Sequence, residues 1–273
     1  MELSMMTFSN LRSLIYDQTG IFFQDNKRYV LEGRLQCRVK ERNCSSYEEY
    51  YTLLKFDAWR DKEMALVYDL VTTNETYFYR DVAQLQAFMG TIIPDVMKVN
   101  HATCTLRIWS AACSTGDEPY TLAIMLQEHP VISKWNVEIL ASDISETVLD
   151  TARKGIYGQY AVRHVPAHLL LKYFTKEQGQ YELSPAIRKK VRFMNLNLYD
   201  TARLKLIRGM DVTLCRNCLI YFDEKAKQKI VSNLYDSLRP NGYLIIGFSE
   251  SLHNVTRSFK PVHAEKSVVY QKL

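Results

Sequence analysis

Acidic side chains stand at two places where a protein with a parallel sheet would hold a ligand. The segment SAACSTGDEPY (110–120) follows a short apolar run and opens a helix with Asp117 and Glu118. Asp143 ends the next apolar run. Ligands of open α/β sheets bind beyond the carboxyl ends of the strands, and an acid after the second strand can accept hydrogen bonds from ribose hydroxyls. These positions predict a nucleoside site.

The loop between the first apolar run and its helix argues against a phosphate ligand. The chain contains neither G-x-x-x-x-G-K-[ST] nor G-x-G-x-x-G, the two patterns that cradle phosphates on backbone N–H groups. Asp117 and Glu118 would repel a phosphate placed there. S-adenosylmethionine fits these requirements, because it is a nucleoside derivative that lacks phosphates and carries positive charge. The alternative for Asp143 is a cap on the helix that begins near Ser145.

Metal and thiol chemistry have little support in the sequence. The six histidines show no ligand spacing, and Cys215 and Cys218 form the one CxxC arrangement. A structural zinc site of four cysteines needs a second such pair. We therefore expect no metal site, and we expect the CxxC to span a strand end without a redox role.

Five segments, in order, resemble the successive signatures of the CheR-type chemotaxis receptor methyltransferases. They are TTNETYFYRD (72–81), RIWSAACSTGDEPYTLAIML (107–126), ILASDIS (139–145), NLNLYD (195–200) and the long segment CRNCLIYFDEKAKQKIVSNLYDSLRPNGYLIIGFSES (215–251). The resemblance covers nearly the whole chain. It implies a cytoplasmic bacterial enzyme that moves a methyl group from S-adenosylmethionine to the γ-carboxylate of glutamates on the cytoplasmic helical region of chemoreceptors. The products would be a glutamate methyl ester and S-adenosylhomocysteine.

The resemblance also implies roles for individual residues. Arg80 and Tyr221 are the expected catalytic pair, with Tyr221 beside the transferred methyl. A guanidinium can clamp a carboxylate, either of the substrate or of the cofactor. A glutamate side chain, with a pKa of about 4.3, is already an ionised nucleophile, so no general base is required. The expected cofactor-binding positions are Asn74, Thr76, Arg80, Glu118, Asp143, Asn197, Leu198, Cys215, Arg216 and Asn217.

Two kinds of periodicity divide the chain. Helical periodicity fills residues 1–72, whereas apolar runs alternate with amphipathic helices in residues 103–273. That alternation is typical of a doubly wound, mostly parallel sheet, here of the Rossmann-like methyltransferase type. Residues 73–102 are expected to link the domains and cover the cofactor, and residues 156–190 to form a small antiparallel β insertion. The predicted strands are 105–113, 137–143, 191–198, 211–217, 242–250 and an antiparallel edge strand at 267–273.

Two surfaces are candidates for receptor contact. Arg34, Arg38 and Arg42 form a stripe beside the apolar face of a helix, which fits either an acidic partner or plain solvation. The β insertion is the second surface, although a decorative insertion is an open alternative. Its hairpin loop contains Gly179 alone, which favours a member that does not bind a C-terminal receptor pentapeptide.

Composition sets the remaining expectations. The chain has 273 residues, a net charge of +5 and no apolar run of the roughly 18 to 20 residues that a membrane span needs. We expect a cytoplasmic monomer that neither inserts into membranes nor binds nucleic acid. Two rival functions remain: a methyltransferase acting on RNA or a small molecule with the same cofactor, and a non-catalytic module that senses the cofactor.

Overall fold

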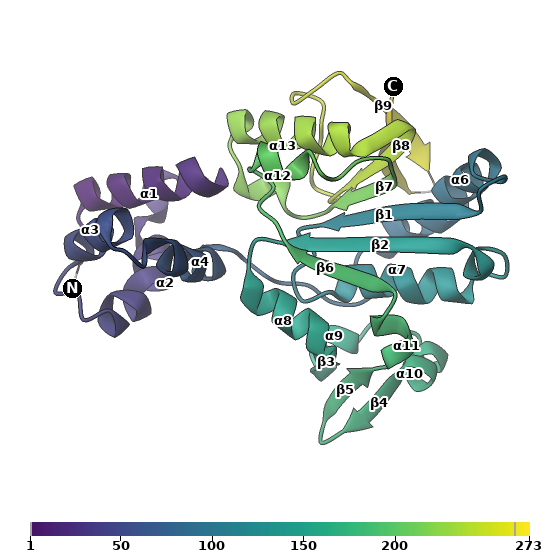
Figure 1. Cartoon of the computed structure of the whole chain (residues 1–273), viewed down its shortest axis with the longest axis horizontal. Coiled ribbons are helices and arrows are strands. Elements are labelled where there is room, and N and C mark those ends of the chain that lie inside the picture. The colour runs from purple at the N-terminus through teal and green to yellow at the C-terminus, as the bar shows by residue number, and fades with distance from the viewer. Residues whose placement is uncertain (1, 265) are drawn as a thin grey trace.

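A helical unit and a sheet-based unit are joined by an extended segment, residues 72–81, in the computed structural model (Figure 1). The structure describes residues 2–264 and 266–273. The helical unit consists of α1 (Met5–Thr19), a short 3-10 turn η1 (Asp25–Lys27), α2 (Arg28–Glu41), α3 (Tyr47–Phe56) and α4 (Arg60–Val71).

The helical unit has its own apolar core. Helix α1 is capped at its start by Ser4, whose side chain accepts a hydrogen bond from the backbone N–H of Thr7, and at its end by Gly20 in the left-handed conformation. The inward faces of the four helices bury a single cluster of side chains, which includes Leu11, Ile15, Leu35, Tyr47, Tyr50 and Val67. This packing, rather than helix propensity, stabilises such short helices.

The sheet-based unit contains seven strands in the order β6-β2-β1-β7-β8-β10-β9. Five of them are parallel, with the registers expected of a doubly wound sheet. The predicted fold class is therefore confirmed. The strands are β1 (Thr105–Ala111), β2 (Asn136–Asp143), β6 (Val191–Asn195), β7 (Met210–Cys215), β8 (Leu238–Ile246), β9 (Phe259–Ala264) and β10 (Ser267–Lys272).

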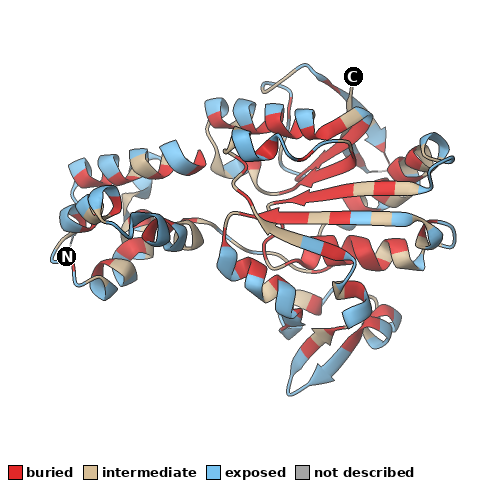
Figure 2. Cartoon of the chain, viewed as in Figure 1, coloured by how far each residue is buried: buried red, intermediate tan, exposed pale blue. Residues whose placement is uncertain are grey.

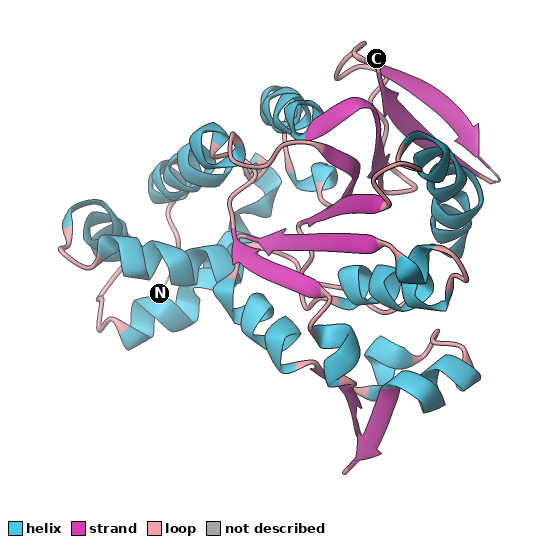
Figure 3. Ribbon diagram, turned by 45° about the vertical axis from the view of Figure 1, so that its right-hand side comes forward, coloured by secondary structure: helices cyan, strands magenta, loops and turns pink. Residues whose placement is uncertain are grey.

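Helices cover both faces of this sheet (Figure 3). Successive strand residues point to opposite faces, so β1 sends Leu106 and Ile108 into one core cluster and Trp109 and Ala111 into another. The central strands are accordingly buried along most of their length (Figure 2). The helices and helical turns are α5 (Val82–Ala87), η2 (Phe88–Ile92), α6 (Ile93–Val99), α7 (Asp117–Glu128), η3 (Ile132–Lys134), α8 (Glu146–Lys154), α12 (Thr201–Leu204), η4 (Leu219–Tyr221) and α13 (Glu224–Ser237).

The predicted insertion is present as a small second sheet with the strand order β3-β5-β4. Gln178 and Gly179 form a two-residue hairpin turn, both with positive φ, as a tight hairpin requires. The elements of this subdomain are β3 (Ile156–Tyr157), α9 (Gln159–Val162), α10 (Ala167–Tyr173), β4 (Phe174–Glu177), β5 (Gln180–Leu183) and α11 (Pro185–Arg188).

Two sequence expectations were wrong in detail. Strand β10 is antiparallel but lies between β8 and β9, so the edge strand is β9, whose Pro261 suits an edge because it cannot donate a ladder hydrogen bond. The expected linker 73–102 is also too long. Residues 82–99 form α5, η2 and α6, whose apolar side chains pack into the core of the sheet-based unit.

Among the residues that the structure describes, no helix combines the length and the apolar character needed to cross a membrane.

Candidate functional site

The loops that follow β1, β2, β6 and β7 surround a cavity of about 1080 Å³, part of it open to solvent. Strand order reverses between β1 and β7, which is where open α/β sheets bind ligands. Of the predicted site residues, the cavity brings together Asn74, Thr76, Arg80, Glu118, Asp143, Asn197, Leu198, Arg216, Asn217 and Tyr221.

Glu118 is fixed at the first-strand loop by two partners. Ser110 of β1 donates its hydroxyl to Glu118 Oε1 at 2.7 Å, and Arg216 Nη1 lies 2.9 Å from Oε2. The neighbouring Asp117 points away from this pair and is fully buried, with Thr115 donating to its Oδ2 at 2.6 Å. Burial raises the pKa of Asp117 to about 6, and the hydrogen bond from Thr115 opposes the rise. The two adjacent acids therefore have different environments.

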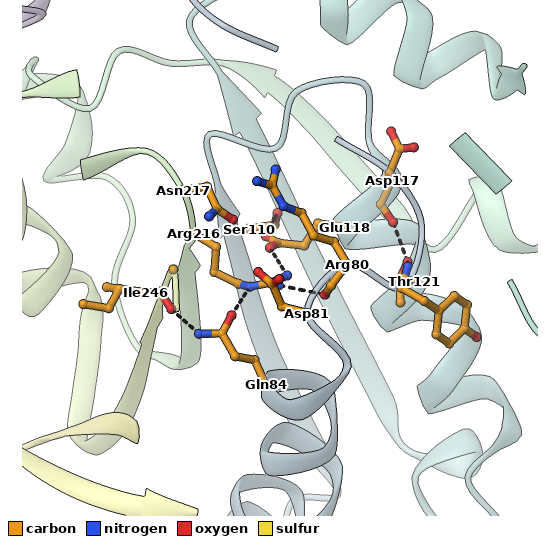
Figure 4. A network of polar contacts seen from close by, with 12 residues as sticks. Arg80, Asp81, Gln84, Ser110, Asp117, Glu118, Thr121, Arg216, Asn217 and Ile246 are labelled. Carbon is orange, nitrogen blue, oxygen red and sulfur yellow. Dashed lines mark hydrogen bonds and ion pairs between the residues drawn. The ribbon is translucent and has the colours of Figure 1, made fainter. Parts of the chain in front are cut away.

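Arg216 is the centre of a polar network (Figure 4). Its guanidinium reaches Asp81 Oδ2 at 3.0 Å, the backbone carbonyl of Arg80 at 2.8 Å and Gln84 Oε1 at 2.6 Å, in addition to Glu118. Gln84 in turn donates to the carbonyl of Ile246 at the end of β8. Thus one buried cation connects the loops after β1 and β7 with the joining segment.

Asp143 is held by backbone donors at the end of β2. Ser114 donates its N–H to Oδ2 at 2.9 Å and Ser145 donates to Oδ1 at 3.0 Å. Burial raises the pKa of Asp143, and the bonds from Ser145 and Ser114 limit the rise. Ser145 itself is the N-cap of α8, so Asp143 supports the helix start and also lines the cavity. The two alternatives considered for Asp143, a ligand contact and support of the start of a helix, are therefore compatible with each other.

The three aromatic residues of the joining segment, Tyr77, Phe78 and Tyr79, have different surroundings. Phe78 is fully buried and makes edge-to-face contacts with Tyr157 and Phe174, with ring centroids 4.9 and 5.2 Å apart. Tyr77 lines the cavity, whereas Tyr79 donates its backbone N–H to Thr121 and turns its ring into the core. Phe78 is thus the anchor, and Tyr77 is the aromatic residue on the ligand side.

Backbone strain concentrates around the cavity. The left-handed conformation costs an ordinary L-residue roughly 1 to 2 kcal/mol and persists where surrounding contacts enforce it, often at functional sites. Among the described residues, nine non-glycine residues have positive φ, and five of them lie in the cavity loops or the joining segment: Tyr79, Asp81, Ala112, Ser114 and Asn217.

The two predicted catalytic residues both face the cavity. Arg80 donates to the carbonyl of Glu75 at 2.7 Å, and its guanidinium carbon lies 5.7 Å from the ring centroid of Tyr77. Among the described residues, no carboxylate lies within ion-pair distance of Arg80. Tyr221 enters from the turn after β7, where its carbonyl accepts the N–H of Phe22 from the helical unit. A cation available for a carboxylate therefore shares the cavity with a phenol.

The helical unit closes one side of the cavity, which the sequence did not reveal. Thr19 and Ile21 line it, and Ile21 forms an isolated bridge with Phe222. Gly20 between them has a φ of 74°, and a Cβ there would lie 2.7 Å from the Tyr199 ring. No periodic pattern marks these residues; the glycine was the one local signal.

Further contacts attach α1 to the sheet-based unit. Tyr16 donates its hydroxyl to Asp223, and Asn197 donates to the carbonyl of Gln18 at 2.7 Å. Burial, together with the adjacent Asp223, raises the pKa of Tyr16 to about 12. Asn197, an expected cofactor residue, therefore uses its amide NH₂ for the junction between the two units.

One predicted cofactor residue does not line the cavity. Cys215 is fully buried at the end of β7, whereas Cys218, for which we predicted no role, is a lining residue. Strand geometry explains this difference. The side chain of Cys215 belongs to the sheet core beneath α13, and the chain turns toward the cavity only at Arg216 and Asn217.

The expected free basic stripe on α2 is also corrected. Arg38 is bound by the buried Glu63 at 2.8 Å and by Glu41, and Arg42 approaches Glu63 and Asp57. Arg34 donates to the carbonyl of Val71 and to the hydroxyl of Thr73 at 2.9 Å. These arginines hold α2 against α4 and the start of the joining segment, so the stripe is not left to solvent.

The lining suits a phosphate-free, cationic nucleoside. Two carboxylates, Glu118 and Asp143, face the cavity at the ends of β1 and β2, where a cationic amine and ribose hydroxyls would find acceptors. Apolar side chains, among them Leu196 and Leu198, supply a wall for an aromatic base. Within residues 2–264 and 266–273, no three His, Cys, Asp or Glu side chains gather as a metal site would require.

Comparisons with known proteins agree with this geometry. A family model described as the SAM binding domain of CheR methyltransferase matches residues 74–268, and one described as its all-alpha domain matches residues 6–72. Chemotaxis protein methyltransferase 2 of Vibrio cholerae is 37% identical over 97% of this chain and 92% of its own length. Chemotaxis protein methyltransferase 1 of Pseudomonas aeruginosa is 33% identical over 97% of both chains. The cofactor is therefore S-adenosylmethionine, and the chain belongs to the CheR methyltransferase family.

Proposed function

We propose that this protein is a protein-glutamate O-methyltransferase of bacterial chemotaxis. It would transfer a methyl group from S-adenosylmethionine to the γ-carboxylate of glutamates on the cytoplasmic helical region of chemoreceptors. The products would be a glutamate methyl ester and S-adenosylhomocysteine, formed in the cytoplasm. The names of the relatives support the chemotaxis setting. The observation that carries the proposal is that Arg80, which makes no ion pair among the described residues, lines the same cofactor cavity as Tyr221.

The chemistry asks the protein for orientation rather than proton transfer. Bound S-adenosylmethionine supplies an electrophilic methyl on a sulfonium. A glutamate carboxylate is ionised at neutral pH and needs no base. Arg80 would hold its oxygens in a fixed plane, and the Tyr221 hydroxyl would orient the same group. Restricting the two reactants to an attacking geometry can lower the activation free energy by roughly 7 to 11 kcal/mol.

Glu118 and Asp143 would set the position of the methyl donor. Their orientation is fixed by hydrogen bonds that need no ligand, from Ser110 and Arg216 to Glu118 and from Ser114 and Ser145 to Asp143. Donor-fixed carboxylates avoid reorganisation when a charged ligand binds. The same arrangement would serve a methyltransferase that acts on another substrate. It therefore supports the identity of the cofactor but not the identity of the methyl acceptor.

A methyl-transfer assay tests the proposal. Radiolabelled S-adenosylmethionine is incubated with the protein and with membranes that contain chemoreceptors, and labelled receptor is treated with base. Release of volatile methanol is expected, because a carboxylate methyl ester hydrolyses under those conditions and a methylated nitrogen does not. Label found on RNA or on a small molecule would favour the rival methyltransferase. Cofactor binding without any transfer would favour a non-catalytic sensor.

A further inference from the structure

An exposed arginine beside the cavity contacts two tyrosine rings, which stand nearly perpendicular to each other with an interplanar angle of 79°. The guanidinium carbon of Arg163 lies 3.7 Å from the ring centroid of Tyr77 and 3.5 Å from that of Tyr160. Tyr77 lines the cavity, and the Tyr160 hydroxyl donates to Glu75 Oε1 at 3.0 Å. An arginine side chain normally loses much rotamer freedom when it binds a partner. Here the stacking has already restricted that freedom.

Arg163, like Arg80, makes no ion pair with a carboxylate of the described residues. Throughout the described part of the chain, no carboxylate comes within ion-pair distance of its guanidinium, whereas Arg38, Arg153 and Arg216 each bind two or more. Its Nη1 donates to the carbonyl of Tyr160. Its other N–H groups have no acceptor among the described residues, and a guanidinium presents such groups in the planar fork that a carboxylate binds bidentately.

Arg163 and Arg80 share one aromatic ring. Their guanidinium carbons lie 3.7 and 5.7 Å from the centroid of Tyr77, Arg80 in the cavity and Arg163 on the exposed surface of the β subdomain. The backbone N–H of Phe78 donates to the carbonyl of Ala161 at 3.0 Å, which fixes the joining segment against α9. Because both distances are to the same centroid, the two guanidinium carbons are at most 9.4 Å apart. Side chains three or four residues apart on a helix, whose Cβ atoms lie roughly 5 to 6 Å apart, can reach both.

We propose that Arg163 is a docking cation for the substrate protein. It would bind a second carboxylate of an acidic helix, one turn away from the glutamate that Arg80 receives. The inference rests on the proposed function, because it names how the acceptor is recognised at the same site. A competing explanation is a latch, in which the stack only fixes Tyr77 and Glu75 against the cavity.

Steady-state kinetics separate docking from a latch. The full-length protein is assayed with a purified cytoplasmic helical fragment of a chemoreceptor, and the affinity for S-adenosylhomocysteine is measured by calorimetry. Arg163→Gln removes the charge and should raise the KM for the fragment about 3- to 5-fold, as expected for an exposed ion pair. The kcat and the affinity for S-adenosylhomocysteine should stay at the wild-type values, and Arg163→Lys should restore part of the KM. An unchanged KM would overturn the inference.

Two controls sharpen this experiment. Arg257→Gln removes the same charge from an exposed loop residue that does not line the cavity, and should leave the KM unchanged. Tyr160→Phe keeps the ring and removes the hydroxyl that binds Glu75. If Arg163→Gln and Tyr160→Phe both weaken S-adenosylhomocysteine binding, and to a similar extent, the arginine acts as a latch and the docking role is wrong.

Fragment variants identify the partner carboxylate. Each acidic residue near the methylated glutamate is replaced by glutamine and tested with wild-type protein and with Arg163→Gln. One position should lose its effect on KM when Arg163 is absent; additive effects at every position would contradict direct pairing. If wild-type protein transfers no methyl to the fragment or to receptor membranes, the proposed function fails. If it transfers methyl with a KM that Arg163→Gln does not alter, only the docking role fails.

Discussion

Arg216 Nη1 lies 2.9 Å from Glu118 Oε2, and the two side chains are only 3% and 13% exposed. The same guanidinium binds Asp81 of the joining segment at 3.0 Å. One cation therefore holds the acid at the start of α7 and the residue next to Arg80. The positions of the cofactor-binding loop and of the predicted carboxylate clamp depend on a single buried side chain.

Replacing Arg216 should harm both stability and cofactor binding. Arg216→Met leaves Glu118 with a buried charge and no cation, and a broken buried pair typically costs about 3 to 5 kcal/mol. We expect urea unfolding to show a loss of that size and calorimetry to show weaker S-adenosylhomocysteine binding. Arg216→Lys keeps the charge but not the four-acceptor geometry and should lie in between. Wild-type affinity in the Met variant would exclude the positioning role.

Arg80→Ala should abolish methyl transfer while the protein remains folded. Among the described residues, the Arg80 side chain bonds only the Glu75 carbonyl and lies over the Tyr77 ring, so the free energy of unfolding should change by about 1 kcal/mol or less. Loss of one oriented donor to a reacting group costs about 10²- to 10³-fold in kcat in other enzymes. Turnover near the wild-type rate, in a variant whose circular dichroism is native, would end the catalytic assignment.

The raised pKa of Asp117 predicts that the free energy of unfolding depends on pH. Its pKa is about 6 in the folded protein, above its usual value of 3.8, because it is buried with Oδ1 lacking a partner among the described residues. The folded state thus binds this proton more tightly than the unfolded state does. The stability that the protonated form contributes is present below about pH 4 and is lost as the pH rises through about 6.

Asp117→Asn should therefore stabilise the protein at pH 7 by about 2 to 3 kcal/mol, with the advantage shrinking toward pH 4. The amide oxygen can still accept the hydrogen bond from Thr115. Asp61→Asn, at a side chain that is 94% exposed, is the matched control and should show no such trend. Parallel stability curves for wild type and Asp117→Asn from pH 4 to pH 7 would contradict the shifted pKa.

Much of the site could be predicted from strand ends, because the topology of a doubly wound sheet fixes where those ends meet. Asp143 ends an apolar run and Glu118 lies in the first helical turn after one, and both line the cavity. The sequence could not predict Thr19 and Ile21, because their place depends on how the helical unit packs against the sheet-based unit. The prediction of a free basic stripe on α2 was wrong for a related reason. Helical periodicity shows which face Arg38 shares, but not that Glu63 of α4 lies opposite.

Gly20→Ala tests the junction between the two units. The residue has a φ of 74°, and an added Cβ would lie 2.7 Å from the Tyr199 ring. Strain in the left-handed region alone costs roughly 1 to 2 kcal/mol. We expect at least that loss in unfolding free energy, together with weaker cofactor binding because the adjoining Thr19 and Ile21 line the cavity.

A matched control for Gly20→Ala lies in the same unit. Gly33 is inside α2, and nothing outside its chain neighbours and the nearby backbone of its own helix lies within 4 Å of where its Cβ would be. Gly33→Ala should stabilise the protein by about 0.5 to 1 kcal/mol through helix propensity, the opposite sign. If Gly20→Ala leaves both stability and cofactor affinity unchanged, the close contact with Tyr199 does not hold the units together.

Arg38→Glu should act on the fold of the helical unit before it acts on any partner. Burial disfavours ionisation of Glu63, yet hydrogen bonds from Arg38 and Tyr50 keep the pKa of this carboxyl below its usual value. Reversing the charge at position 38 places two carboxylates together and removes the cation, at a cost of about 3 to 5 kcal/mol.

Lys40→Glu provides the comparison, since Lys40 is exposed on the same helix and its reversal should change stability by about 0.5 kcal/mol or less. Chemical denaturation followed by far-UV circular dichroism reports on both variants. Equal stability of the two would show that Arg38 does not hold α2 to α4. A large loss in Arg38→Glu alone means that its receptor kinetics report unfolding, and that Lys40→Glu measures the surface charge of α2.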